Sequence, residues 1–220
     1  MKNLKSLIEN KNEIDNIVIV CAGSTLKKDK DALLRFVAKN NSVTIGVNNM
    51  SSLLIPDYHI WTNSGRLKEF GNCISNESSL FLGKNITSDL LNKYDNKKSF
   101  LVSYSDKRKT KYRYKRGNIS GYFRTAGCLS IMISHLLGAK KIYVAGMDGY
   151  TFIDKKSIEN KTSSQHLYGK GNTDKTTWDQ CVEKDKIVDN ILNGLKNYGI
   201  KFSIITPTVF NNHYNADILI

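Results

Sequence analysis

The chain has 220 residues, enough for one domain with a full hydrophobic core. Its 33 lysine and arginine residues outnumber 20 acidic residues, so the formal net charge is +13, which favours an anionic partner such as nucleic acid, a nucleotide-activated substrate, phospholipid or acidic glycan. Only 2 prolines and 15 glycines argue against a disordered or fibrous chain, and no apolar run approaches the roughly 20 residues of a membrane-spanning helix.

The cysteines indicate the compartment. Cys21, Cys73, Cys128 and Cys181 are scattered, with no CxxC pair and no histidine at metal-ligand spacing. We therefore expect reduced and mostly buried thiols in a cytoplasmic protein. No signal peptide is recognisable at the start. The sequence predicts one domain over residues 1–220, held at most by charge at the inner face of a membrane.

The first half of the chain alternates apolar strands with helices. The run of β-branched residues at 17–21 is typical of a strand buried on both faces. The predicted strands span residues 17–21, 43–47, 57–62 and 80–83, and the predicted helices span residues 4–12 and 64–70, with another that begins at Asp29 or Asp31. This alternation predicts a doubly wound, mostly parallel α/β sheet.

The second half contains a less regular part and one clear unit. The predicted elements are a helix over residues 89–94, a strand over 99–104, a basic loop over 106–117, a helix–strand unit over 125–150, an amphipathic helix over 174–198 and a strand over 200–205. Residues 151–165 are polar and aperiodic, and such a long polar loop is often a binding loop or a lid. We expect a short lid there. Asp174 or its neighbour Thr173 would cap the long helix.

Small polar residues follow several predicted strands. In open α/β sheets, ligands bind beyond the carboxyl ends of the strands, where helix N-termini meet anionic groups. Gly23 and Ser24 follow the first strand and can present backbone N–H groups to a phosphate; an ordinary turn with a capping hydroxyl is equally compatible. Gly146 and Asp148 end the central strand, where an aspartate suits a ribose hydroxyl or a loop cap.

Asparagines and one histidine complete the candidate site. Asn48 and Asn63 follow the second and third strands, where carboxamides can bind a base or a sugar, although asparagine is also common in turns. His166 lies in a polar loop near the expected pocket and is the best candidate for a general base. His135, on an apolar helix, is more readily explained as a core residue.

Two further motifs can each be explained without a catalytic or RNA-binding function. Asp29-Lys30-Asp31 matches the metal-binding DxD string, but acids at a helix start also interact favourably with the helix dipole. The basic run over 106–117 is interleaved with tyrosines and could bind RNA. No known RNA-binding module is present, so a loop that faces phosphate or lipid is the simpler interpretation.

The TAG turn at 125–127, the LGAKKIYVAGMDGY strand and the HLYGKGNTD segment together resemble the bacterial sialyltransferases of glycosyltransferase family 42. The resemblance spans most of the chain. It implies a Rossmann-like sheet (a GT-A-like variant) with a mobile lid. It also implies a CMP-activated sialic acid or related acidic sugar as donor, a cell-surface glycan or glycolipid as acceptor, inversion at the anomeric carbon, no cofactor and no metal.

Position by position, the resemblance assigns roles. His166 matches the catalytic base and Tyr150 a tyrosine that stabilises the departing phosphate. The donor and nucleotide are assigned to Gly23, Ser24, Asn48, Asn63, Thr125, Ala126, Gly127, Gly146 and Asp148. The chain departs from the family at Ala22, where an asparagine is usual, and at Ala126, where a serine is usual. A different acidic sugar is therefore compatible with the sequence.

Two other functions remain open at this point. A pterin-type pyrophosphokinase that uses Mg²⁺ shares the glycine turn and the strand-end aspartate, but His166 and the lack of an acidic cluster count against it. A non-catalytic basic module that binds RNA or an anionic membrane would leave the pocket residues unexplained. The predicted partners are a nucleotide-sugar donor, a glycan or glycolipid acceptor, an anionic membrane surface and a second copy of the chain, with no specific nucleic acid.

Overall fold

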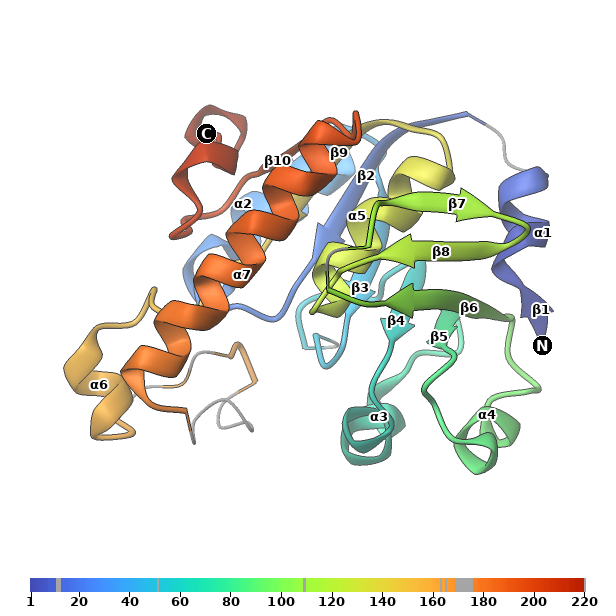
Figure 1. Ribbon diagram of the computed structural model, residues 1–220, viewed down its shortest axis with the longest axis horizontal. Coiled ribbons are helices and arrows are strands. Elements are labelled where there is room, and N and C mark those ends of the chain that lie inside the picture. Colours follow the sequence, from blue (N-terminus) through green and yellow to red (C-terminus); the bar gives the residue numbers. More distant parts are fainter. Residues whose placement is uncertain are drawn as a thin grey trace.

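The computed structural model describes residues 1–10, 13–50, 52–108, 110–162, 164, 166–168 and 176–219. In these residues the chain forms an α/β, Rossmann-like fold with ten strands in one largely parallel sheet (Figure 1). The strand order is β10-β9-β2-β3-β4-β5-β6-β8-β7, and β1 pairs with β6. The predicted fold class is confirmed.

The strands are β1 (Lys2–Asn3), β2 (Ile14–Val20), β3 (Val43–Val47), β4 (Tyr58–Trp61), β5 (Ser79–Gly83), β6 (Ser99–Asp106), β7 (Arg113–Lys115), β8 (Asn118–Gly121), β9 (Ala139–Ala145) and β10 (Phe202–Ile204). The helices are α1 (Leu4–Glu9), α2 (Leu26–Lys39), α3 (Ser64–Phe70), α4 (Ser88–Lys93), α5 (Ala126–Leu136), α6 (Lys155–Glu159) and α7 (Trp178–Asn197), with short 3-10 turns at Gly71–Cys73, Asn211–His213 and Ala216–Ile218.

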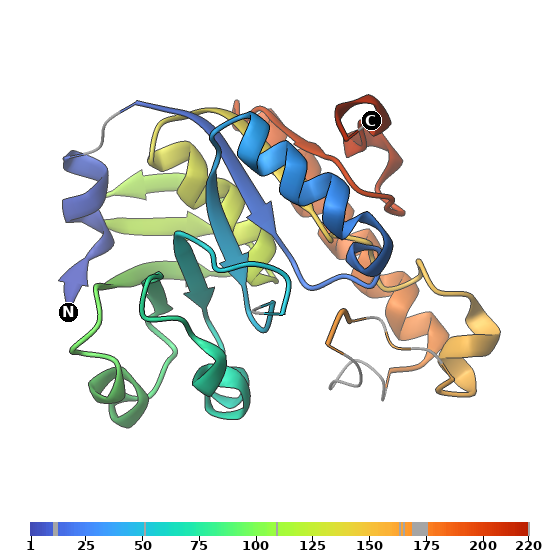
Figure 2. The same ribbon diagram turned by 180° about the vertical axis from the view of Figure 1, so that it is seen from behind.

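Strand β2 lies inside the sheet, third in the strand order, with β9 on one side and β3 on the other, both parallel to it. Its last residues alternate between two apolar layers, as side chains of a strand must. Ile17 and Ile19 pack with α5 and α7, whereas Val18 and Val20 pack with α2. Figure 2 shows α2 on the opposite side of the sheet from α5 and α7. Both layers exclude solvent, which explains the continuous β-branched run.

Helix α2 begins at Leu26, so the prediction of a start at Asp29 or Asp31 is wrong. Thr25 precedes the helix without a capping bond from its own side chain. Its backbone N–H donates instead to the carboxylate of Asp148, at 2.8 Å. The cap comes from a residue more than a hundred positions away, and no local pattern could have predicted it.

The basic run is not a simple loop, because β7 pairs with β8 in an antiparallel hairpin. The left-handed residues Arg116 and Gly117 make its turn. Tyr112 and Tyr114 pack against the main hydrophobic core, while Arg113 and Lys115 are exposed. The hairpin therefore presents cations to solvent and directs its tyrosine rings inward, which is unfavourable for base stacking.

Other expectations are refined by the structure. The predicted lid contains α6, and α7 begins at Trp178 behind a capping box made by Thr177. The capping residues expected at 173 and 174 lie outside the described residues. His135 is exposed, so its prediction as a core residue is wrong; its ring lies 6.2 Å from that of Tyr198, at the end of α7.

The cysteines agree with the prediction: all four are present as thiols, of which Cys21, Cys128 and Cys181 are buried and Cys73 is exposed. In the part of the chain that the structure describes, no helix has the length and apolar character to span a membrane.

Candidate functional site

A cavity of about 220 Å³ lies at the carboxyl ends of β2, β3 and β9. It brings together nine residues predicted from the sequence: Gly23, Asn48, Thr125, Ala126, Gly127, Gly146, Asp148, Tyr150 and His166. Arg66 and Tyr168 also line it, and the sequence did not indicate either. Ser24 and Asn63 are not among its lining residues.

Gly23 packs against the end of β9 with no room for a side chain. Its N–H donates to the carbonyl of Gly146 at 2.9 Å. A Cβ at position 23 would stand 2.3 Å from Oδ1 of Asp148 and 2.4 Å from the Gly146 carbonyl, far inside contact distance. Packing between the two strand ends is therefore sufficient to require a glycine at position 23, whether or not a ligand binds there.

Asp148 ties the end of β9 to the turn after β2. Its carboxylate accepts from the Thr25 N–H at 2.8 Å, from the Thr25 hydroxyl at 2.5 Å and from the Ser24 hydroxyl at 3.2 Å. The side chain is buried, and burial raises the pKa of its carboxyl although the three hydrogen bonds act in the opposite direction. Of the interpretations that the sequence allowed for Asp148, these hydrogen bonds support the loop cap.

Asn48 is held in a left-handed backbone conformation, with φ of 56°. Its N–H donates to Ile60 at 3.2 Å, and its carbonyl accepts from Nε2 of His59 at 2.5 Å. Burial lowers the pKa of His59 to about 4, so the neutral ring supplies the N–H. His59, which the sequence did not indicate as part of the site, therefore positions the strained residue Asn48, which lines the cavity.

Asn63 is separated from this cavity. Its side chain caps α3 by accepting from the N–H of Arg66 at 3.0 Å. It lines a second, polar cavity of about 190 Å³, which shares Thr125 with the first. The other polar residues around this second cavity are Thr62, Asn85, Tyr104, Asp106 and Arg124.

The N-terminus of α5 opens into the main cavity. Thr125 caps the helix, and its hydroxyl oxygen accepts from the N–H of Cys128 at 3.1 Å. Ala126 and Gly127 form the first turn, whose N–H groups have no partner within a helix. A Cβ at Gly127 would meet the Met147 methyl at 2.8 Å, so glycine lets the helix end sit directly on the strand ends. This geometry suits an anion.

His166 is fixed to the opposite wall. It forms an isolated antiparallel bridge with Gly23, and the next N–H, of Leu167, donates to Ala22 at 2.8 Å. The imidazole stacks on the ring of Tyr168, with centroids 4.9 Å apart and planes at 7°. The histidine that follows the lid in sequence is thereby brought to the turn that follows the first long strand.

Tyr168 is held in turn by α3. Its hydroxyl accepts from the guanidinium of Arg66 at 2.6 Å, and its ring contacts Phe70 at 5.1 Å between centroids. Arg66 and Phe70 are four residues apart and thus share one face of the helix. This spacing could have indicated from the sequence that the two side chains share a face of α3. Nothing in the sequence indicated that the segment with Tyr168 packs against that face.

Tyr150 is supported by a second buried carboxylate. Asp185 of α7 accepts from the N–H of Tyr150 at 2.7 Å, from the N–H of Thr151 at 2.8 Å and from its hydroxyl at 2.7 Å. The Lys184 ammonium lies 5.1 Å from the Tyr150 ring centroid. Burial raises the pKa of the Tyr150 phenol, so the hydroxyl keeps its proton and can donate to an anion.

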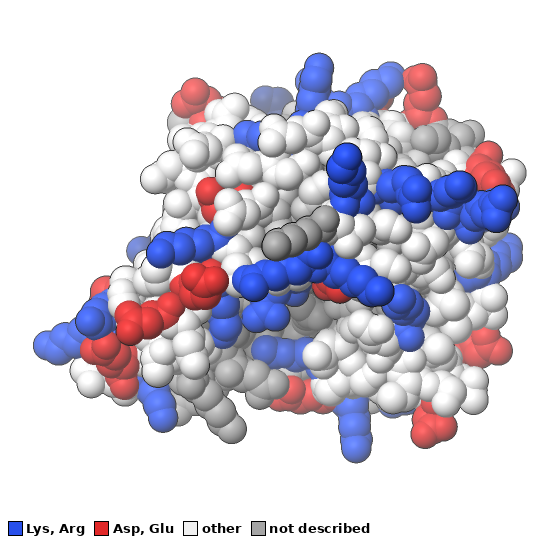
Figure 3. Space-filling view, in the orientation of Figure 1, with Lys and Arg blue, Asp and Glu red and all other residues white. Residues whose placement is uncertain are grey.

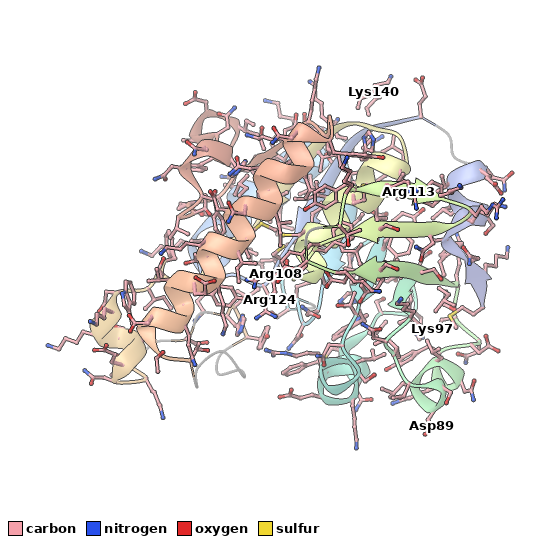
Figure 4. The ribbon with its side chains drawn as sticks, viewed as in Figure 1. Asp89, Lys97, Arg108, Arg113, Arg124 and Lys140 are labelled. Atoms are coloured by element: carbon pink, nitrogen blue, oxygen red, sulfur yellow. The ribbon has the colours of Figure 1, made fainter. Side chains whose placement is uncertain are left out.

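Cations surround the site. Figure 3 shows lysine and arginine side chains gathered across the middle of one face, around a hollow. Arg108 and Arg124, labelled in Figure 4, lie in that region; Arg108 is 4.0 Å from Glu183, and Arg124 lines a shallow groove with the same glutamate. Within the described residues, no group of three histidine, cysteine or acidic side chains is arranged to hold a metal ion.

No protein-family model matches the sequence, and no curated protein matches it. Among solved structures, the fold is similar to that of a mammalian sialyltransferase in complex with Gal-beta-1-3GalNAc-ortho-nitrophenol. The two chains are 13% identical, with a TM-score of 0.41, and the match covers 93% of this chain and 80% of that one. A similarity of this size carries no argument about activity or substrate.

Proposed function

We propose that this protein is a glycosyltransferase that transfers a CMP-activated sialic acid, or a related acidic sugar, to a glycan or glycolipid acceptor. The observation that carries the proposal is the single cavity that gathers a histidine, a strained asparagine, a tyrosine hydroxyl and a helix N-terminus. Each comes from a different part of the chain, and together they offer a base and donors to an anion.

In the proposed reaction, the acceptor hydroxyl attacks the anomeric carbon of the donor from the face opposite the nucleotide. The bond between that carbon and the CMP phosphate oxygen breaks, which inverts the configuration. His166 takes the proton of the attacking hydroxyl. The negative charge that develops on CMP is met by the Tyr150 hydroxyl and the free N–H groups of α5, so the chain's own residues supply the stabilisation.

The second cavity is the proposed place for the acceptor. It adjoins the donor cavity at Thr125 and is lined by carboxamides, a carboxylate and a tyrosine hydroxyl, which are the groups that bind sugar hydroxyls. Asn63 would then contact the acceptor side of the site, although the resemblance assigned it to the nucleotide. An anionic membrane surface and a second copy of the chain remain predicted partners.

A panel of nucleotides tests the donor class. Thermal shift and calorimetry with CMP, CDP, UMP, AMP and ATP should show preferential binding of CMP without added Mg²⁺. Tight binding of ATP that requires Mg²⁺, with no response to CMP, would refute the proposal and favour a pyrophosphokinase.

Substitution of the base tests the mechanism. His166→Ala should lose transfer while it keeps its affinity for CMP, because the ring is assigned to the proton rather than to the nucleotide. His135→Ala is the matched control, since that ring is exposed on α5 outside the cavity. Full transfer activity in His166→Ala would remove the base assignment.

A further inference from the structure

Arg66 is placed where an anionic substrate would meet it. It is the third residue of α3, is half-buried and lines the same cavity as Asn48 and His166. Its backbone N–H is held by the capping Asn63 side chain, so the first turn of the helix directs it to this edge of the sheet. The guanidinium donates to the hydroxyl of Tyr168 and lies 5.7 Å from that ring's centroid.

No described residue neutralises the charge of Arg66. None of the ion pairs in the described part of the chain includes Arg66. Among the described residues that line the cavity, Asp148 is the one carboxylate, and its oxygens already accept three hydrogen bonds from the turn after β2. A guanidinium has five N–H donors, and Tyr168 is its one described side-chain hydrogen-bond partner. A ligand can therefore use the remaining donors.

The cavity thus contains two separate features that favour negative charge: the N-terminus of α5 and the Arg66 guanidinium. A nucleotide linked to a neutral sugar brings a phosphate only, whereas a nucleotide linked to an acidic sugar also brings a carboxylate. The planar fork of a guanidinium matches a carboxylate in a bidentate pair. Ala126 has no hydroxyl, so its side chain cannot donate to a carboxylate at the start of α5.

We propose that Arg66 recognises the carboxylate of the transferred sugar and that it selects an acidic donor over a neutral one. This inference rests on the proposed function, because it assumes a nucleotide sugar in the same cavity. Tyr168 is a positioning residue: its hydroxyl and ring hold the guanidinium in place, and its ring also stacks on His166. Recognition of the donor and placement of the base are thereby coupled through one aromatic ring.

The test compares two ligands in one variant. In Arg66→Gln, calorimetry without acceptor should give a dissociation constant for CMP-linked sialic acid raised about 10- to 100-fold, the range expected for hydrogen bonds to a charged group. The dissociation constant for CMP alone should stay within about twofold, because CMP lacks the carboxylate. Tyr168→Phe should weaken binding of the sugar nucleotide by a smaller factor and leave CMP unchanged.

Lys68→Gln is the control, since it removes one exposed cation from the same helix. Equal weakening of CMP and of the sugar nucleotide in Arg66→Gln would overturn the assignment, because Arg66 would then serve the phosphate or the fold. Unchanged affinity for both ligands would also overturn it. A folded wild-type protein that binds neither ligand would instead refute the donor class, an outcome distinct from either result in the variant.

Discussion

Substitutions of Asp148 and Asp185 can be compared to distinguish effects on the stability of the fold from effects on ligand binding in the cavity. Each is a buried carboxylate that accepts three hydrogen bonds from two consecutive residues. In Asp148→Ala, the buried N–H and hydroxyl of Thr25 lose their acceptor. An unsatisfied buried group costs about 1–3 kcal/mol, so we expect the free energy of unfolding to fall by about 3–5 kcal/mol, and by a similar amount in Asp185→Ala.

Asp148→Asn gives the sharper comparison. An asparagine can accept from the Thr25 N–H with its oxygen and donate to the Thr25 hydroxyl with its nitrogen, so the loss should be below about 1 kcal/mol. Equilibrium unfolding in urea, followed by circular dichroism at constant m-value, measures these differences. CMP affinity should fall more in Asp148→Ala, whose side chain lines the cavity, than in Asp185→Ala, which loses only the support of the Tyr150 backbone. If Asp148→Asn were as unstable as Asp148→Ala, the hydrogen-bond argument would be refuted.

Three other changes probe the backbone of the site and the charged surface. In Gly23→Ala, the new methyl would stand 2.3 Å from the Asp148 carboxylate, so we expect a thermal midpoint lowered by several degrees and no CMP binding; an unchanged melting curve would contradict the packing argument. His59 has a folded pKa of about 4, below its ordinary value, so the unfolded chain binds more protons and stability is lost as pH falls from 6.5 to 4. His59→Gln should lose less stability than the wild type between pH 6.5 and 4, as measured by thermal melts at several pH values. An equal loss in the two proteins would exclude His59 as the cause of the pH dependence. Arg113→Glu, on the exposed edge strand, should weaken binding to phosphatidylglycerol vesicles about fivefold or more in a sedimentation assay and should not change binding to neutral vesicles. If the variant and the wild type bound phosphatidylglycerol vesicles equally, the membrane contact would lie elsewhere.

The regular part of the fold could be predicted because its physical cause is local. Strands β2 and β3 are buried on both faces, and their β-branched runs reflect that burial directly. Gly138 follows the end of α5 and has φ of 82°, the left-handed conformation in which a glycine commonly ends a helix. The hairpin over β7 and β8 was missed, since two strands of three and four residues give little periodicity and their high charge indicated a loop.

The cavity was partly predictable for a topological reason. Residues at the carboxyl ends of parallel strands converge at one edge of the sheet, so Gly23, Asn48 and Asp148 could be grouped without a structure. Arg66 could not, because its role depends on Tyr168, far along the chain, and His59 could not, because its contact with the Asn48 carbonyl depends on how two neighbouring strands pair. Asn63 was grouped with these residues but does not line the main cavity. Its strand end is equivalent to that of Asn48, but its side chain caps α3 and lines the neighbouring cavity.

The position of the cavity follows from the strand order. The chain leaves β2 toward β3 through α2 on one face, and later returns to β9, on the other side of β2, through α5 on the opposite face. Helices that diverge from neighbouring strand ends leave a crevice between them, and a ligand at such a switch point meets two helix N-termini and glycine-rich turns. Before α2, the N–H of Thr25 donates to Asp148, and the first N–H groups of the helix donate to the carbonyls of Gly23 and Ser24. At α5, Thr125 accepts from Cys128, and among the described residues no partner is found for the N–H groups of Ala126 and Gly127. Of the two helices, α5 is therefore the better placed for an anionic ligand, and Arg66, across the same cavity, is the second positive group, by which we propose that an acidic sugar is distinguished from a neutral one.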